Sequence, residues 1–385
     1  MIAWTTTTLE ECTDILGDGL HGTPKYTENG EYAFVNGNNL VNGEILIKKD
    51  TKRVDYSQYN KYKKPLTKRS LFVSINGTLG NVGTYNWEKV VLGKSVCYFN
   101  VKESVDKDFI YYVVSSLAFK QYLESNATGT TIKNISLKQM REYEFLLPPI
   151  KEQKKISSIL KIIDKKIKNN RLINENLLEQ AQAIFAHTFP YTTSDTLPKG
   201  WRLGTVGEII EIHDSKRIPL SGAQRDKIKK KIYPYYGAAS LMDYVDEYIF
   251  DGKYLLLGED GTVVDNAGFP ILQYVWGQFW VNNHAHILTG KLGYSVESLY
   301  ILFKQTTVKS IVTGAVQPKI SQANLKSIAV VIPPANVIEA FNKQVDAMFT
   351  LIRNNKEENK RLTALREGLL PKLMSGELDV SNLDI

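Results

Sequence analysis

Hydrophobic residues follow two different patterns along this chain of 385 residues. Residues 1–149 and 190–334 carry short apolar runs that end in turn residues, as in SLFVSINGTLG (70–80) and KYLLLGEDGTV (253–263). Such runs are typical of strands in a globular domain. Residues 150–189 and 335–385 instead carry apolar positions at helical spacing. The pattern predicts an α+β protein in which two globular mixed α/β domains alternate with two long helices.

Both helical segments repeat apolar or Asn positions at alternating steps of three and four residues, which is a heptad pattern. The first series is Ile156, Leu160, Ile163, Ile167, Asn170, Asn174, Leu177, Ala181 and Ile184. The second is Phe341, Val345, Met348, Ile352, Asn355, Asn359, Leu362, Arg366 and Leu369, with Leu365 as an alternative to Arg366. A Pro pair precedes each segment, where proline is tolerated at a helix start.

The second half of the chain repeats the first. TGTTIKNISLKQMREYEFLLPP (128–149) and TGAVQPKISQANLKSIAVVIPP (313–334) align without a gap, and the matched Asn positions of the helical segments follow at the same offset. The segments between these landmarks differ. We therefore expect a duplicated unit whose two copies share a scaffold but not a surface.

An isolated helix with this seam would expose its apolar stripe, so we predict that the two helices pair. The globular domain between the two helices brings the chain back to the end of the first helix, which favours an antiparallel coiled coil. A helix of about 35 residues is roughly 50 Å long at about 1.5 Å per residue, so the pair would act as a spacer between the domains. The seam Asn residues either face one another and fix the register, or lie just off the seam in solvent.

The net charge is +7 and the pI is near 9.0, which suits a polyanionic partner but also serves solubility. Cys12 and Cys97 have no CxxC spacing, which argues against a zinc site or a disulfide scaffold. The N-terminal residues lack the basic and apolar regions of a signal peptide, and no apolar run reaches about 18 residues. We expect a cytoplasmic protein with no membrane partner.

Two basic clusters interleaved with tyrosines are candidates for contact with DNA, because lysine and arginine bind phosphates and tyrosine suits groove contact. The first consists of Lys61, Lys63, Lys64, Lys68 and Arg69. The second includes Lys227, Lys229 and Lys230 and is followed by Tyr235 and Tyr236. Solvated loops are the alternative for both clusters.

Further candidate DNA contacts lie in the turns. Lys216 and Arg217 occupy a segment that differs between the copies, and arginine is the side chain best suited to guanine. The Thr-Gly segments of both copies supply Thr130, Lys133, Gln317 and Lys319, which would contact backbone phosphates or simply turn the chain.

Catalytic motifs are not found in the sequence. Gly93-Lys94-Ser95 lacks the first glycine of a phosphate-binding loop, because that position is Glu88. The Pro-Pro pairs lack the preceding Asn or Asp of an amino-methyltransferase loop. His213, His284 and His286 could be metal ligands, but no Cys or carboxylate cluster supports them, so we expect no metal. A turn after a strand explains Glu259-Asp260 better than a nuclease carboxylate pair.

Several segments resemble the specificity subunits of type I restriction-modification systems. LLPPIKEQKKISSILKIIDKKIKNNRLINENLLEQAQAIF (146–185) is similar to their central conserved region, and LLPKLMSGELDV (369–380) to their C-terminal signature. DGLHGTPKY with NGEI (18–26, 42–45), and four segments within 216–288 (KRIPL, YPYYGA, FDGKYLLLGEDG and FWVNNHAHIL), resemble two classes of target recognition domain.

The resemblance implies a non-catalytic subunit with target recognition domains at 1–149 and 190–334 and conserved helices at 150–189 and 335–385. Each domain would read one half of a split, asymmetric double-stranded DNA target. Two modification subunits with S-adenosylmethionine and two restriction subunits with ATP and Mg²⁺ would complete the enzyme, so no cofactor is expected on this chain. PANVIEAFNKQ (334–344) lacks the pair Glu152-Gln153, so the two docking faces would be unequal.

Two other classes of function remain open. A self-contained methyltransferase or nuclease would bind its cofactor as the isolated chain. A coiled-coil adaptor would show no salt-dependent binding to duplex DNA, whereas a DNA-reading subunit would.

Overall fold

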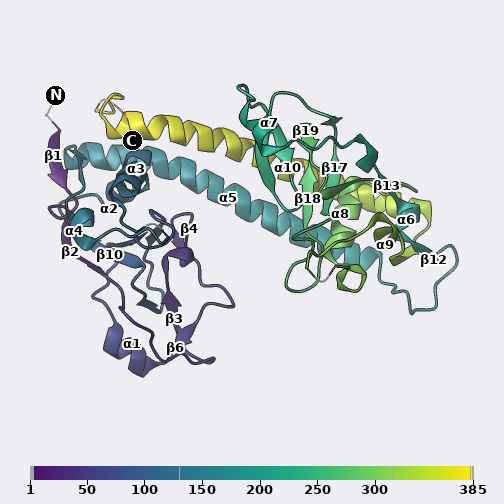
Figure 1. Cartoon of the computed structure of the whole chain (residues 1–385), viewed down its shortest axis with the longest axis horizontal. Helices are drawn as coiled ribbons and strands as arrows, with labels where there is room; N and C mark the ends of the chain where they lie inside the picture. The colour runs from purple at the N-terminus through teal and green to yellow at the C-terminus, as the bar shows by residue number, and fades with distance from the viewer. Residues whose placement is uncertain (1–3, 130, 315, 382, 384–385) are drawn as a thin grey trace. The chain divides into compact units, whose positions relative to one another are not determined.

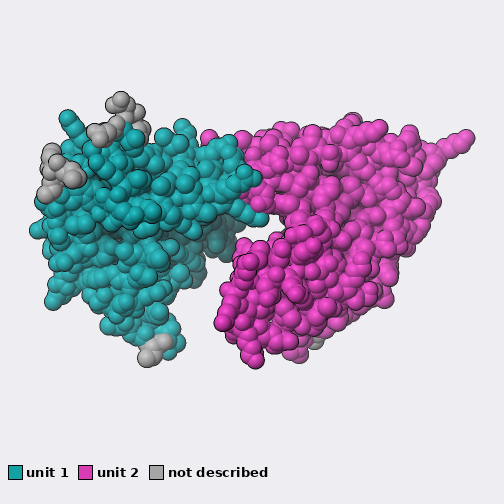
Figure 2. Space-filling view, turned by 90° about the horizontal axis from the view of Figure 1, so that it is seen from above, with its two compact units in different colours: residues 1–168, 358–385 teal, residues 169–357 magenta. Residues whose placement is uncertain are grey.

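The computed structural model describes residues 4–129, 131–314, 316–381 and 383. The chain divides into two compact units, residues 1–168 with 358–385 and residues 169–357 (Figure 2). Each unit holds one globular part and one portion of each long helix. We call residues 4–149 the first head and residues 190–334 the second head.

The first head is built from a four-stranded antiparallel sheet and smaller strand groups (Figure 1). The main sheet has the order β2-β10-β7-β8, a smaller sheet has the order β6-β3-β9, and β1 pairs with β11. The strands are β1 (Thr5–Thr8), β2 (Thr13–Asp18), β3 (Tyr32–Val35), β4 (Leu40–Val41), β5 (Glu44–Ile45), β6 (Arg53–Val54), β7 (Ser70–Ser74), β8 (Val82–Thr84), β9 (Val90–Leu92), β10 (Val96–Val101) and β11 (Glu144–Leu147). The helices are η1 (Gly37–Asn39), α1 (Tyr56–Tyr62), α2 (Lys107–Ser115), α3 (Leu117–Asn126) and α4 (Leu137–Arg141).

The second head repeats this plan. Its main sheet has the order β13-β20-β17-β18, and β12 pairs with β21 as β1 pairs with β11. The strands are β12 (Arg202–Thr205), β13 (Ile210–Ile212), β14 (Tyr233–Tyr236), β15 (Leu241–Val245), β16 (Phe250–Asp251), β17 (Tyr254–Gly258), β18 (Leu272–Val275), β19 (Gln278–Val281), β20 (Ala285–Gly290) and β21 (Ala329–Ile332). The helices are α6 (Val206–Ile209), η2 (Asp214–Lys216), α7 (Gly222–Asp226), α8 (Val296–Lys304), η3 (Lys309–Ile311) and α9 (Gln322–Lys326).

The correspondence extends to the second sheets. In the first head β3 runs parallel to β9, and in the second head β14 runs parallel to β19, whereas the other pairings in these sheets are antiparallel. Ser136 and Ser321 cap the short helices α4 and α9 by accepting bonds from Gln139 N and Asn324 N. The expected duplication of a mixed α/β unit is therefore confirmed by the fold.

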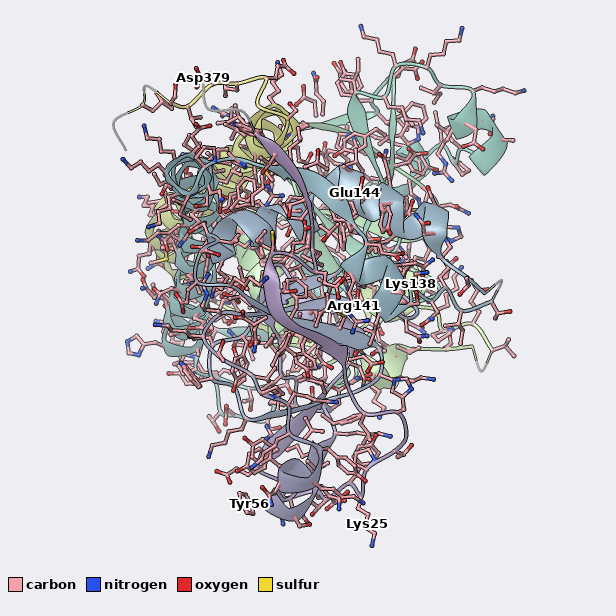
Figure 3. The ribbon with its side chains drawn as sticks, turned by 90° about the vertical axis from the view of Figure 1, so that its left-hand side faces the viewer. Lys25, Tyr56, Lys138, Arg141, Glu144 and Asp379 are labelled. Carbon is pink, nitrogen blue, oxygen red and sulfur yellow. The ribbon has the colours of Figure 1, made fainter. Side chains whose placement is uncertain are left out.

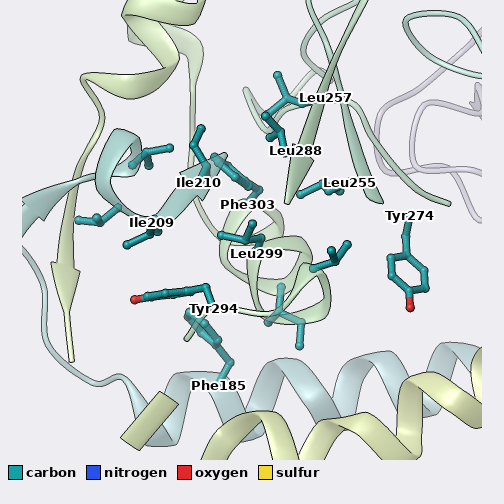
Figure 4. Packing of buried hydrophobic residues seen from close by; sticks show 14 of the residues in the cluster. Phe185, Ile209, Ile210, Leu255, Leu257, Tyr274, Leu288, Tyr294, Leu299 and Phe303 are labelled. Carbon is teal, nitrogen blue, oxygen red and sulfur yellow. The ribbon is translucent and has the colours of Figure 1, made fainter. Parts of the chain in front are cut away.

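Each head buries its core against its own part of the two long helices, α5 (Ile150–Thr188) and α10 (Ala335–Met374). In unit 1, Leu71, Phe99 and Phe109 share a cluster with Ile156 of α5 and Leu373 of α10. Unit 2 has the matching arrangement, in which the cluster of Leu255, Leu299 and Phe303 includes Phe185 of α5 and Phe341 of α10 (Figure 4). Burial of each such side chain contributes about 1.5–3 kcal/mol, so the heads and helices fold as joint units.

The two long helices pair in antiparallel fashion within each unit, as predicted. In unit 1, Asn359 donates to the carbonyl of Ile167 (3.3 Å). In unit 2, Asn174 donates to the carbonyl of Ile352 (3.4 Å), and Asn355 donates to Oδ1 of Asn174 (2.9 Å). Residues later in α5 contact residues earlier in α10, so the two helices run in opposite directions.

The seam side chains are buried to different degrees. Ile163, Ile167, Asn170, Ile352 and Asn355 are buried, whereas Asn174, Leu177, Met348, Asn359 and Leu362 are half-buried. Phe349 is buried more completely than its neighbour Met348. Leu365 is exposed, and Arg366 faces the partner helix through an ion pair with Asp164. Polar contacts thus alternate with apolar ones along the seam.

Within the described residues, no helix combines the length and hydrophobicity needed to cross a bilayer. Cys12 and Cys97 are free thiols, and both are buried. Burial raises the pKa of both thiols, which keeps them protonated and unreactive.

Candidate nucleic-acid interface

The Thr-Gly loops (residues 128–134 and 313–319) are closed by the same backbone hydrogen bonds in both heads. Thr128 and Asn134 exchange backbone hydrogen bonds of 3.0 and 2.8 Å, and Thr313 and Lys319 exchange bonds of 2.9 and 2.7 Å. Thr128 and Thr313 each direct a hydroxyl at the carbonyl across the loop, at 3.3 Å. The two ends of each loop are therefore fixed in the same way.

A glycine in the left-handed region opens each loop. Gly129 has φ +90°, and a Cβ there would lie 2.4 Å from the carbonyl oxygen of Ile132. Gly314 has φ +88°, and a Cβ there would lie 2.2 Å from the carbonyl oxygen of Gln317. An L side chain at either position would clash and strain the turn, which explains why both copies contain glycine.

Each Thr-Gly loop is hydrogen-bonded to the turn that follows a strand of the main sheet, β7 in the first head and β17 in the second. Gly77 N donates to the Lys133 carbonyl (2.9 Å), and Gly261 N donates to the Pro318 carbonyl (3.0 Å). Nothing lies within 4 Å of a Cβ built on Gly77 or Gly261. Both heads therefore present an open glycine turn hydrogen-bonded to a Thr-Gly loop, although their other loops differ.

The described residues of these loops include exposed polar and basic groups. Lys133 is exposed in the first head, and Gln317 and Lys319 are exposed in the second. Lys319 also lies 3.3 Å from Glu259. Thr130, another predicted contact, lies outside the described residues. Exposed ammonium groups beside an open backbone are suited to contact with phosphate oxygens.

The first basic cluster begins in helix α1, whose first residue Tyr56 lies at the same end of the first head as Lys25 and apart from Lys138 and Arg141 of α4 (Figure 3). Lys61, Lys63 and Lys68 are exposed, and Lys64 is half-buried. The Lys61 ammonium is 5.0 Å from the centre of the Tyr62 ring. Exposed positive charge thus lies beside a tyrosine ring at the end of α1.

Arg69 differs from the lysines of its cluster because its guanidinium group is held by the fold. Nε donates to the carbonyl of Val101 (2.7 Å), and Nη2 donates to those of Lys102 (2.7 Å) and Val105 (2.5 Å). The side chain therefore joins β10 to the start of α2.

The second basic cluster surrounds helix α7. Lys227, Lys229 and Lys230 are exposed. Tyr235 is buried, and its hydroxyl accepts a bond from Leu220 N (3.0 Å), whereas Tyr236 is half-buried and packs edge-on against Phe279. The exposed lysines can therefore approach a ligand, whereas the two tyrosines of β14 pack within the second head.

Lys216 and Arg217 are neighbours in sequence but differ in environment. Lys216 is exposed. The side chain of Arg217 is only 13% exposed, and its guanidinium lies 2.6 Å from Glu259 and 3.4 Å from Asp214. Nη1 also donates to the carbonyl of Ala285 (2.8 Å). Arg217 therefore ties η2 to β20 and to the turn after β17.

A buried polar network surrounds Arg217, and the sequence did not reveal it. His286 contacts Asp214 (2.6 Å) and the Ile320 carbonyl (2.8 Å) through its two ring nitrogens, and Gln322 donates to Asp214 (2.6 Å). Burial would raise the pKa of Asp214, but the hydrogen bond from His286 and further partners outweigh it, so the pKa is lowered. The carboxylate is thus held ionised, and its partner His286 also contacts the residue that follows the Thr-Gly loop, Ile320.

Three side chains of this network are of the types that ligate metals. Because the Arg217 guanidinium contacts both of the acids, we interpret the network as a cluster of ion pairs. One ligand atom each of Asp214, Glu259 and His286 lies within 4.8 Å of the others, and the guanidinium of Arg217 contacts both acids. The three histidines considered from sequence are bound separately. His213 contacts Thr289 (2.7 Å), and His284 contacts Asp260.

The fold and these surfaces define a duplicated protein in which two related α/β heads, each with a Thr-Gly loop bonded to a glycine turn, are built onto paired long helices. The family model described as "Type I restriction modification DNA specificity domain" matches residues 1–179 and 198–367. The chain belongs to this family. It is therefore a DNA-recognition component of a type I restriction-modification system and not its catalytic part.

Individual relatives agree with this assignment. The "Type I restriction enzyme MjaIX specificity subunit" of Methanocaldococcus jannaschii is 23% identical over 94% of this chain and 87% of its own length. A putative type I specificity subunit of Mycoplasma pneumoniae is 22% identical, with 96% of each chain covered. The crystal structure of a type I restriction-modification S subunit from M. genitalium has the same fold, with a TM-score of 0.59, 22% identity and coverage of 97% and 96%.

Proposed function

We propose that each head reads one half of a bipartite, asymmetric sequence in double-stranded DNA, and that α5 and α10 set the gap between the halves. The helices also dock two modification subunits, which carry S-adenosylmethionine and methylate adenine. Two restriction subunits with ATP and Mg²⁺ join to give cleavage. The heads correspond to residues 1–149 and 190–334, and the spacer segments to 150–189 and 335–385.

One observation carries this proposal. The Thr-Gly loop and its glycine turn occur with the same hydrogen bonds in both heads, whereas the other loops of the two heads differ. Contacts to the DNA backbone are the same at every sequence, whereas contacts to bases must differ between half-sites. The matched Thr-Gly loops and glycine turns suit the first task. The dissimilar segments around α1 and around η2 and α7 suit the second. Lys216 and the lysines of the two basic clusters supply charge on these segments.

The direct test is to express the chain with its modification partner and map methylated adenines in the host genome. We expect two different short half-sites separated by a constant gap. One uninterrupted motif, or methylation by this chain without its partner, would contradict the proposal. In purified complexes, duplex binding should weaken steeply with salt, and a coiled-coil adaptor would show no such dependence.

Substitution of Lys133 by alanine should weaken binding to the same extent on every duplex that contains the target. If Lys133 contacts a phosphate, its removal lowers the slope of log K against log salt by about one and leaves the half-sites unchanged. The slope can be measured by fluorescence anisotropy at several salt concentrations. Lys199→Ala is the matched control, because Lys199 is exposed on the segment between α5 and β12 and its loss changes the net charge equally. A change in base preference would make Lys133 a base contact, and no change at all would remove it from the interface.

A further inference from the structure

In each unit one acidic side chain accepts hydrogen bonds from a tyrosine and an arginine at the place where a head meets the long helices. In unit 1 the acid is Asp164 of α5, which accepts bonds from the Tyr112 hydroxyl of α2 and from Arg366 of α10, each 2.8 Å long. We call Tyr112, Asp164 and Arg366 the first latch. Three elements, one from the head and two from the helix pair, thus meet at one carboxylate.

In unit 2 the acid lies on the head. Glu297 of α8 accepts bonds from the Tyr274 hydroxyl of β18 (2.7 Å) and from Arg353 of α10 (3.1 Å). Arg353 also donates to the Tyr274 oxygen, and Lys253 lies 2.7 Å from the acid. We call Tyr274, Glu297 and Arg353 the second latch. The side chain of Glu297 is only 3% exposed, so these bonds are made away from water.

The charge of the second latch is stabilised by its partners. Burial would raise the pKa of Glu297, but hydrogen bonds from Lys253 and Tyr274 outweigh this effect and lower the pKa. Charge-assisted hydrogen bonds have narrow preferences in distance and angle, whereas apolar contacts tolerate sliding. The apolar clusters therefore attach the heads to the helices, and the latches restrict each head to one orientation on them.

The two latches are not copies of each other. At the offset of 185 residues that relates the helices, Asp164 corresponds to Phe349, and Arg353 corresponds to Lys168. A feature inherited through the duplication would occupy corresponding positions. The same combination of acid, tyrosine and arginine was instead assembled twice from different positions, which indicates that each head needs such a connection.

We propose that the latches are the positioning devices that make the gap between the two half-sites strict. This inference rests on the proposed function, because a gap exists only if the heads read separate half-sites. Loss of a latch leaves the base-reading surfaces intact but allows the head to tilt on the long helix to which the latch binds it, α5 for the first head and α10 for the second. Neighbouring gap lengths then become acceptable. The tyrosines are positioning residues and make no contact with DNA.

The test uses Tyr112→Phe and Tyr274→Phe in the complete methyltransferase complex. Initial methylation rates are measured on duplexes with both half-sites and gaps shorter than, equal to or longer than the preferred one. The ratio of the rate at the preferred gap to the rate at gaps one base pair away should fall by about tenfold, the factor expected for loss of one hydrogen bond to a charged group. The half-site sequences should not change.

Two controls separate positioning from general destabilisation. Tyr122→Phe removes a hydroxyl bond to the Gln139 carbonyl within the first head. Tyr300→Phe removes the hydroxyl of a tyrosine whose ring lies near Phe349 and Tyr274 but which is not a member of the second latch. Both should keep the gap ratio of the unaltered protein. If a latch variant does not fold, as judged by circular dichroism, Arg366→Lys replaces it, because lysine keeps the charge and loses the planar geometry.

An unchanged gap ratio in the latch variants, or an equal fall in the controls, would overturn the inference. Failure of the proposed function would look different, because the unaltered complex itself would then show no dependence on the gap.

Discussion

The variant Arg217→Ala is expected to destabilise the second head strongly and to leave the stability of the first head unchanged. The arginine compensates two acids of low exposure, Glu259 at 2.6 Å and Asp214 at 3.4 Å, and donates to the Ala285 carbonyl. Removal of one partner from a buried ion-pair network costs about 3–5 kcal/mol. That is a large part of the roughly 5–15 kcal/mol that stabilises a folded domain. Limited proteolysis followed by mass spectrometry would locate cleavage in residues 190–334.

The neighbouring residue supplies the control for this variant. Lys216 is exposed, so Lys216→Ala should leave the unfolding transition unchanged and affect only DNA binding. The pair of variants also decides between two roles for Arg217. If Arg217 reads a guanine, its alanine variant will remain as stable as the unaltered protein and lose specificity in the second half-site. A stable variant would therefore contradict the structural role.

The penalty of Arg217→Ala should depend on pH in a defined direction. The pKa of Asp214 is lowered in the folded state, so its ionisation favours folding above the unfolded pKa, and this contribution is lost as the pH falls through the folded pKa. Without Arg217 the carboxylates are less well compensated, and protonation relieves them. The difference in stability between the two proteins should therefore shrink on acidification below about pH 4, near the ordinary pKa of Asp.

The sequence predicted the scaffold because the scaffold depends on local periodicity. The seam from Ile163 to Leu177 and its partner from Met348 to Leu362 could be read from spacing alone, and the repeat showed that the two helices belong together. The Thr-Gly segments were also found from the repeat. Their attachment to Gly77 and Gly261 was not, because it depends on which strand ends lie side by side.

The environments of the basic residues could not be read in the same way. Arg69 and Arg217 sit in polar segments like those of the exposed lysines, yet the fold holds both guanidinium groups. Burial of Arg217 requires that Asp214, Glu259 and His286 meet, and only the pairing of β17, β20 and β13 brings them together. Position 286 corresponds on its strand to Cys97 of the first head, so the repeat gave no hint of the network.

Lengthening both helices by one heptad should widen the gap between the half-sites without changing either half-site. Seven residues inserted after Lys168 and seven after Glu357 keep the seam in register, because both insertions add a whole heptad at the boundary of the two units. They add about 10.5 Å at about 1.5 Å per residue, which corresponds to at most about 3 base pairs of 3.4 Å. A heptad rotates the helix by only about 20°, whereas each base pair of B-DNA rotates by roughly 34° at 10–10.5 base pairs per turn.

The inserted heptad rotates one head by less than the rotation of one base pair, whereas its length would span about 3 base pairs. Rotation is therefore the tighter constraint, and we expect the gap to grow by about 1 base pair. Mapping of methylated adenines measures the gap directly. A control with the same seven residues inserted after Thr192, in the segment between α5 and β12, should keep the original gap, since it leaves the seam unaltered. Insertion into α5 alone should abolish methylation, because the apolar positions of the two helices would no longer face each other. Altered half-sites at a constant gap would show that the helices do not set the spacing.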